Sequence, residues 1–127
     1  EARERVRGIL QAVGEEVYVA EEKYLEMATA LSASGPAFIF LVIEALIDAG
    51  VHIGLPREMA RALAVQTVLG SAQMAKQTGR HPAELKGMVA SPGGTTVEGL
   101  LALEKGGVRA ALVKAVVAAY KKSLALG

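Results

Sequence analysis

The residues best suited to chemistry lie in one short loop, SPGGTT, from Ser91 to Thr96. Two successive glycines let the backbone take positive φ and let a ligand approach without a Cβ in the way. An apolar helical pattern follows, so the N–H groups of the loop would lie at a helix N-terminus, which attracts a carboxylate or a phosphate. The alternative is a turn without a ligand, because Thr95 and Glu98 have the spacing of a capping box, which places the helix start at Thr96.

Other chemical motifs are missing from the sequence. No three glycines have the spacing of a dinucleotide-binding loop, and the residue after Gly99 is not the lysine that a Walker A motif needs. His52 and His81 have no partner at metal-ligand spacing, so we expect no metal site. We expect His52 at a helix C-terminus and His81 as a helix cap before Pro82. No base is marked for a serine or threonine nucleophile.

The composition limits the class of protein that carries this loop. The 127 residues suffice for one domain with a sizeable core. Apolar residues make up 52% and aromatic residues only 4%, which predicts an all-α domain whose helices pack through small side chains. The formal net charge of +1 is too balanced for a nucleic-acid-binding protein. The absence of cysteine fits a reducing compartment, so we expect a cytoplasmic protein.

No membrane segment is expected. The charged stretch EARERVRGIL lacks the apolar core of a signal peptide. The longest apolar run, Pro36 to Ile43, is well short of the roughly 20 residues that span a bilayer. Glu44 and Asp48 follow this run and interrupt its apolar character. We therefore expect no membrane partner.

Helical periodicity recurs along the chain and breaks at glycine and proline. We expect about seven helices, over residues 1–13, 21–32, 37–52, 57–77, 83–89, 96–105 and 108–126. The segment from Val17 to Val19 alternates, and it is either a single strand that pairs with another chain or domain, or an extended connection. The helix over residues 37–52 is apolar nearly all round, which predicts burial against a second copy of the chain.

A long run of positions from Pro82 to Glu104 matches one family signature. The matching residues are Pro82, Leu85, Val89, Ala90, Ser91, Gly93, Gly94, Thr96, Gly99, Leu100, Leu103 and Glu104. The segment ALSASGPAFIF also looks like the helix start SGSGPA of that family, with Ala33 where many relatives have glycine. On these residues the chain resembles, over essentially its whole length, the C-terminal domain of pyrroline-5-carboxylate reductase.

The resemblance implies a function for the whole chain. Residues 1–127 would form the dimerisation and substrate-binding domain, similar to the C-terminal domain of 6-phosphogluconate dehydrogenase-like reductases, without the N-terminal Rossmann domain. Family members are oxidoreductases that reduce 1-pyrroline-5-carboxylate to L-proline with NADPH or NADH, the last step of proline biosynthesis. Their helical domains interlock into a homodimer, often assembled further into a decamer, with the substrate pocket at the dimer interface. This fragment alone is expected to be inactive.

The resemblance also implies roles for individual residues. The backbone amides of Ser91, Gly93, Gly94 and Thr95, with the Ser91 hydroxyl, would bind the substrate carboxylate. The hydroxyl of Thr96 would hydrogen-bond the ring nitrogen, which makes Thr96 the candidate catalytic residue. The absent Rossmann domain would bind most of the cofactor, with candidate contacts in this chain near Ser34, Gly35, Pro36 and Val89.

Two other interpretations stay open on the residues alone. In the first, the chain is a non-catalytic helical self-association module whose Gly-Gly turn is purely structural. In the second, it is the dimer domain of another NAD(P)-dependent dehydrogenase that acts on a different small acid. A small carboxylate bound to the amides of Gly93 and Gly94 would separate an enzyme from the self-association module.

Overall fold

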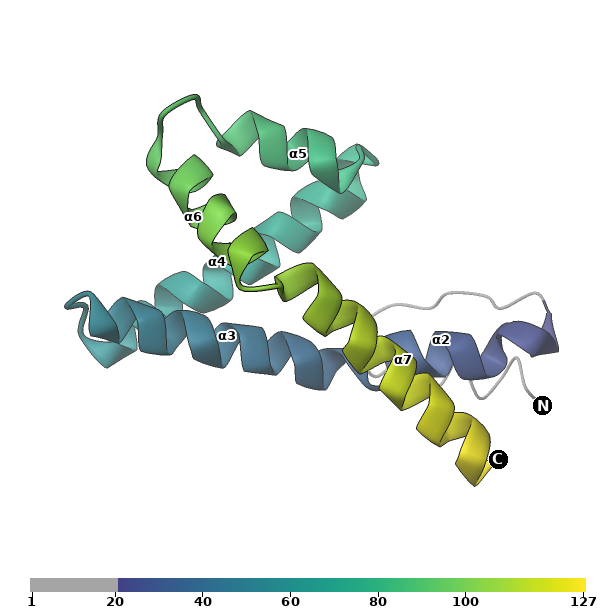
Figure 1. Ribbon diagram of the computed structural model, residues 1–127. Coiled ribbons are helices and arrows are strands. Elements are labelled where there is room, and N and C mark those ends of the chain that lie inside the picture. The colour runs from purple at the N-terminus through teal and green to yellow at the C-terminus, as the bar shows by residue number, and fades with distance from the viewer. Residues whose placement is uncertain (1–20) are drawn as a thin grey trace. The chain divides into compact units, whose positions relative to one another are not determined.

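The computed structural model describes residues 21–127, so the helix expected over residues 1–13 and the segment from Val17 to Val19 lie outside the described part. The elements are the 3-10 helix η1 (Glu22–Tyr24) and the α-helices α2 (Leu25–Ser32), α3 (Gly35–His52), α4 (Arg57–Thr78), α5 (Pro82–Val89), α6 (Thr95–Lys105) and α7 (Val108–Leu126) (Figure 1). These residues contain no strand, which confirms the all-α prediction. From α3 onwards, every helix begins and ends within two residues of its predicted limits.

Local signals set the ends of the helices. The chain leaves α4 at Gly79, whose φ of +65° is the left-handed conformation that glycine adopts at low cost. At the start of α5, Pro82 takes the first helical position, and the N-cap residue His81 accepts a hydrogen bond on Nδ1 from the Ala83 N–H at 3.0 Å. His52 is the last residue of α3. The predicted positions of both histidines are therefore confirmed.

The described residues fall into two compact units, which comprise residues 21–40 with 109–127, and residues 41–108. The first unit contains η1, α2, the start of α3 and nearly all of α7. Its buried apolar side chains are Leu25 and Ala30, both on α2. The Ser123 hydroxyl of α7 donates a hydrogen bond to the Glu26 carboxylate of α2. This bond joins two helices of the unit that lie far apart in the sequence.

The second unit contains the rest of α3 with α4, α5 and α6. Its buried apolar residues are Ala60 and Ala64 on α4. The two long helices approach closely at Gly50, where a Cβ would lie 3.0 Å from the Ala60 Cβ. The Asp48 carboxylate pairs with the Arg57 guanidinium at 3.2 Å across the turn between α3 and α4. Small side chains thus allow close packing of these helices, as the composition predicts.

Most large apolar side chains of the described residues are exposed in the single chain. Among residues 21–127, only four apolar residues are buried, two in each unit. Along α3, five large apolar side chains are between 37% and 67% exposed, namely those of Ile39, Phe40, Leu41, Val42 and Leu46. Several exposed large apolar side chains on one helix are typical of an interface with another chain.

The stretch Glu22–His52 is long and apolar enough to cross a membrane by length and composition alone, because an 18-residue window within it has a mean hydropathy of 1.9. Counting only the consecutive apolar residues from Pro36 to Ile43 did not predict this result. The mean hydropathy also includes the apolar residues on either side of that run. One such stretch is weak evidence for a membrane span, since the core helix of a protein outside the membrane passes the same test.

Candidate functional site

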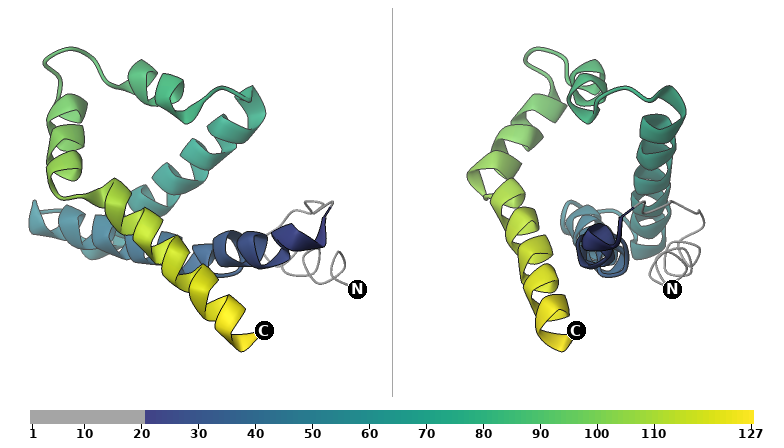
Figure 2. Two further views of the ribbon diagram at one scale, coloured as in Figure 1. Left: turned by 45° about the vertical axis from the view of Figure 1, so that its right-hand side comes forward. Right: turned by 90° about the vertical axis from the view of Figure 1, so that its right-hand side faces the viewer.

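Figure 2 shows the loop that joins α5 to α6. Within this loop, residues Ser91 to Gly94 form a tight turn. The Gly94 N–H donates to the Ser91 carbonyl oxygen at 3.0 Å, which closes the turn. Pro92 occupies its second position, and Gly93 occupies the third with a φ of +71°. This combination is typical of a type II turn, in which proline presets the second residue and glycine relieves strain at the third. The letters SPGG therefore specify the shape of the loop.

The start of α6 differs from the predicted one. The helix begins at Thr95, with Gly94 as its N-cap, and no side chain caps it. The predicted capping box of Thr95 and Glu98 is therefore wrong. The reason is local, because Gly94 completes the turn with an extended backbone (φ −84°, ψ 172°) and the next residue is already helical. Neither threonine hydroxyl therefore caps the start of α6.

Backbone amides determine what the loop can bind. The Gly94 N–H donates to the Ser91 carbonyl oxygen within the turn, and its expected role toward a carboxylate stays a prediction. In the described part of the chain, the amides of Ser91, Gly93 and Thr95 donate to no other backbone group. Unpartnered N–H groups at a helix start carry partial positive charge. Three of the four amides that the family resemblance assigns to an anion therefore have no backbone partner among the described residues.

Two hydroxyl groups accompany these amides. The Ser91 side chain is exposed and the Thr96 side chain is half-buried. Neither hydroxyl hydrogen-bonds another residue of the described chain. A hydroxyl can both donate and accept, so each can serve a ligand that has a carboxylate or a ring nitrogen.

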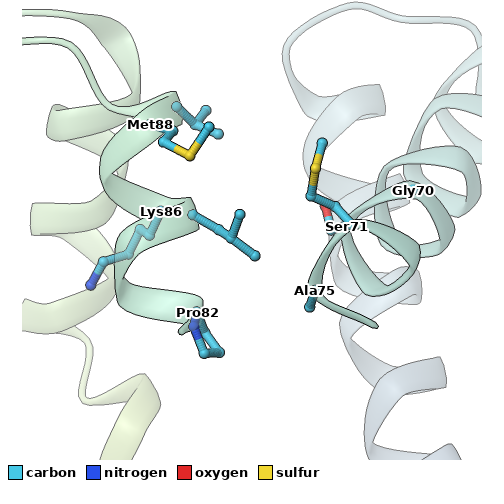
Figure 3. Close-up of a pocket in the computed structure, with 9 residues that line it drawn as sticks. Gly70, Ser71, Ala75, Pro82, Lys86 and Met88 are labelled. Atoms are coloured by element: carbon cyan, nitrogen blue, oxygen red, sulfur yellow. The ribbon is translucent and has the colours of Figure 1, made fainter. Parts of the chain in front are cut away.

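A cavity of about 540 Å³ lies between α4 and α5, beside the loop in sequence (Figure 3). Its lining is mostly apolar and consists of Gly70, Ser71, Met74, Ala75, Pro82, Leu85, Lys86, Met88 and Val89. Figure 3 shows Pro82 and Met88 facing the gap, whereas the Lys86 side chain extends away from it. The lining ends at Val89, two residues before Ser91. This cavity suits apolar side chains, and the loop does not line it.

The candidate cofactor contacts lie at helix ends. Ser34 is in the bend between α2 and α3, and Gly35 and Pro36 are the first residues of α3, in the first unit. Val89 is the last residue of α5, in the second unit. The role of these residues toward a cofactor stays a prediction. No group of three acidic or histidine side chains within residues 21–127 could hold a metal ion.

Sequence reasoning missed one informative residue, Pro92. A Pro-Gly pair at the centre of SPGG is a known signal for a type II turn. Such a turn uses the N–H of its fourth residue to close itself, so the pair already indicated that the Gly94 amide is engaged. The same signal would have placed the start of α6 directly after the turn.

Comparisons with known proteins show which family the chain resembles. The family model described as pyrroline-5-carboxylate reductase dimerisation matches residues 22–126. The pyrroline-5-carboxylate reductase of Glycine max is 57% identical over 84% of this chain and 39% of its own length. The enzyme of the same name from a Synechocystis strain is 50% identical over 97% of this chain and 46% of its own length.

Solved structures are similar as well. The Plasmodium falciparum pyrroline carboxylate reductase with NADP bound has a TM-score of 0.85 and 42% identity, over 98% of this chain and 50% of that one. A pyrroline-5-carboxylate reductase from Coxiella burnetii has a TM-score of 0.86 and 42% identity, over 98% of this chain and 46% of that one. The chain thus spans about half the length of the solved relatives and less than half of the curated ones.

Proposed function

Because the chain belongs to the pyrroline-5-carboxylate reductase family, we propose that it is the helical dimerisation and substrate-binding part of an oxidoreductase that reduces 1-pyrroline-5-carboxylate to L-proline with NADPH or NADH. The observation that carries the proposal is the family match over residues 22–126, which includes the whole loop. The substrate is a small cyclic imine with a carboxylate. The loop offers backbone amides for the carboxylate and a threonine hydroxyl for the imine nitrogen.

The loop would bind the substrate carboxylate. The amides of Ser91, Gly93 and Thr95 are without a backbone partner among the described residues. A carboxylate is a good acceptor for such groups at a helix N-terminus. Charge-assisted hydrogen bonds contribute roughly 1.5–3 kcal/mol each. Two or three of them would contribute roughly 3–9 kcal/mol, from which the cost of association must be subtracted.

Thr96 would act at the other end of the substrate. Reduction adds a hydride to the imine carbon and a proton to the ring nitrogen, so that the C=N bond becomes CH–NH. The nicotinamide cofactor supplies the hydride when it is bound. The Thr96 hydroxyl would hydrogen-bond the ring nitrogen, fix the orientation of the imine and relay the proton. Holding the substrate in place is therefore the main catalytic contribution of this chain.

The described residues do not fit the phosphates of the cofactor. They form helices only, whereas a dinucleotide pyrophosphate is usually bound by a glycine loop between a strand and a helix. We therefore assign the cofactor mainly to a Rossmann domain outside these residues. The similar structure from Plasmodium falciparum has NADP bound, and this chain covers 50% of that protein.

We place the substrate site at a homodimer interface. The apolar side chains of α3 are exposed in the single chain, so burying them is favourable. A second copy of the chain offers an equally apolar surface for this burial. Burial in such an interface also accounts for the apolar stretch Glu22–His52 without a membrane. As the family resemblance implies, we further propose assembly of dimers into a decamer, and a cytoplasmic location in keeping with the absence of cysteine.

Crystals of the complete enzyme soaked with L-proline test the site. We expect the proline carboxylate on the amides of Ser91, Gly93 and Thr95, with the ring nitrogen near Thr96. L-prolinamide is the matched control, because it has the same ring without the negative charge and should not bind there. A loop that stays empty at millimolar proline, or that binds both compounds alike, would favour the non-catalytic self-association module.

A further inference from the structure

The two glycines of the loop are glycine for different reasons. Gly93 has a φ of +71°, a left-handed conformation that strains any residue with a Cβ. Gly94 has an ordinary extended backbone, which every residue can adopt. A Cβ at Gly94 would nevertheless lie 2.6 Å from the Ser91 Oγ and 3.2 Å from the Ser91 carbonyl oxygen. Glycine is thus favoured at position 94 because Ser91 leaves no room for a Cβ there.

The two contacts would respond differently to a side chain at position 94. Real Cβ atoms are essentially never found within 3.0 Å of another heavy atom, so the Ser91 hydroxyl would have to move. That hydroxyl ends a side chain with one rotatable bond, and it can reach another staggered rotamer at low cost. The carbonyl oxygen needs to yield by only a few tenths of an ångström. Alanine at position 94 would therefore keep the turn and displace the hydroxyl.

We propose that Gly94 is a positioning residue for the substrate carboxylate, because its missing Cβ leaves the space in which the Ser91 hydroxyl sits. The inference rests on the proposed function, in which that hydroxyl binds the carboxylate. The Gly94 N–H donates to the Ser91 carbonyl oxygen in the turn, and the direct role expected for this amide toward the carboxylate stays a separate prediction. Gly94 would thus act on Ser91 in two ways: its N–H closes the turn, and its missing Cβ leaves room for the hydroxyl.

A double-mutant cycle in the complete enzyme tests this inference with Ser91→Ala, Gly94→Ala and the combined variant. We expect each single change to raise the KM for pyrroline-5-carboxylate about 10-fold, the effect of one hydrogen bond to a charged group. The combined variant should show the same KM as Ser91→Ala, because no hydroxyl is left to displace. The KM for the cofactor and the Tm serve as controls and should stay close to those of the unchanged enzyme.

Three results would overturn the inference. An unchanged KM in Gly94→Ala would show that the hydroxyl is not displaced. A KM in the combined variant equal to the product of both single effects would show that Gly94 acts independently of Ser91. An unchanged KM in Ser91→Ala would remove the hydroxyl from the proposed carboxylate site itself, so failure of that part of the proposed function is recognised separately.

Folding of the variants gives a second readout. If Gly94→Ala fails to fold while the combined variant folds, the Ser91 hydroxyl is the obstacle, which supports the contact described here. If both fail to fold, the hydroxyl is not the reason for glycine at position 94, and the inference is wrong.

Discussion

Single residues of the loop divide into those that shape it and those left to bind a ligand. Pro92 and Gly93 form the centre of the turn, and Gly94 closes it through its N–H. Because α6 begins at Thr95 without a side-chain cap, the hydroxyl of Thr96 is not used by the helix start. This outcome weakens the interpretation of the two threonines as purely structural caps.

Thr96→Val in the complete enzyme tests the catalytic role at this scale. We expect kcat/KM to fall by about 10- to 100-fold, which corresponds to roughly 1.4–2.7 kcal/mol of lost transition-state stabilisation. Steady-state assays of NAD(P)H oxidation measure it. Thr95→Val is the matched control, since the proposed contribution of Thr95 is its amide, which valine retains. An unchanged kcat/KM in Thr96→Val would remove Thr96 from the mechanism.

Gly93→Ala tests the shape of the turn. Its φ of +71° places an alanine Cβ in the left-handed region, so we expect a loss of about 1–2 kcal/mol in the free energy of unfolding. Thermal unfolding should show a lower Tm. The control is Gly87→Ala, because Gly87 lies inside α5 with no atom within 4 Å of a built Cβ, where alanine is the better helix former. Equal Tm values for both variants would contradict the assigned turn.

Among the elements, the helices agree best with the sequence pattern. Their limits depend on glycine, proline and cap residues a few positions away. The apolar periodicity and these helix-breaking residues therefore predict the limits within two residues from α3 onwards. The start of α6 shows where this reasoning fails. The spacing of Thr95 and Glu98 indicated a cap, but the hydrogen bond that closes the preceding turn shifts the cap to Gly94.

The start of α5 provides a test at the scale of the element. His81→Ala removes the acceptor Nδ1, which lies 3.0 Å from the Ala83 nitrogen. The side chain is exposed, so the cap is the main loss, and we expect the free energy of unfolding to drop by roughly 0.5–2 kcal/mol. Chemical denaturation measures this drop. His81→Asn should keep most of the stability, because asparagine is a good N-cap; an equal drop in both variants would argue against capping.

At the scale of the whole molecule, the described chain buries few apolar side chains and exposes many. The exposed residues include most of the large side chains of α3, and the buried ones are mainly alanines. Since apolar surface exposed to water is unfavourable, this distribution suits a chain whose core is completed by a partner. The family match to a dimerisation region supports the same conclusion.

Self-association is the first test at this scale. We expect sedimentation of the chain at micromolar concentration to show no monomer. Phe40→Asp should raise the dissociation constant, because Phe40 is 67% exposed in the single chain and lies on the apolar helix α3. Lys23→Asp is the control, since the Lys23 ammonium makes an exposed ion pair with Glu21 and lies 5.1 Å from the centroid of the neighbouring Tyr24 ring. Such exposed contacts contribute little. A well-behaved monomer would contradict the interlocked dimer.

Activity is the second test. The 127-residue chain alone should oxidise no NADPH or NADH in the presence of pyrroline-5-carboxylate, because it offers no dinucleotide-binding loop. The complete enzyme, assayed at the same concentration, is the control and should be active. Turnover by the chain alone would contradict the assignment of the cofactor to a separate domain.

By itself, the sequence determined the helical class, the helix limits and the position of the glycine loop, because each of these depends on residues close together in the chain. It also indicated the family, through the run from Pro82 to Glu104. Only the tertiary structure decided which amides of the loop are engaged and that Ser91 occupies the space beside Gly94. It alone showed the contact of Gly50 with Ala60 and the bond from Ser123 to Glu26. The physical reason is that periodicity marks an apolar or a small face on a helix, whereas the atoms that meet it depend on how the backbone turns in space.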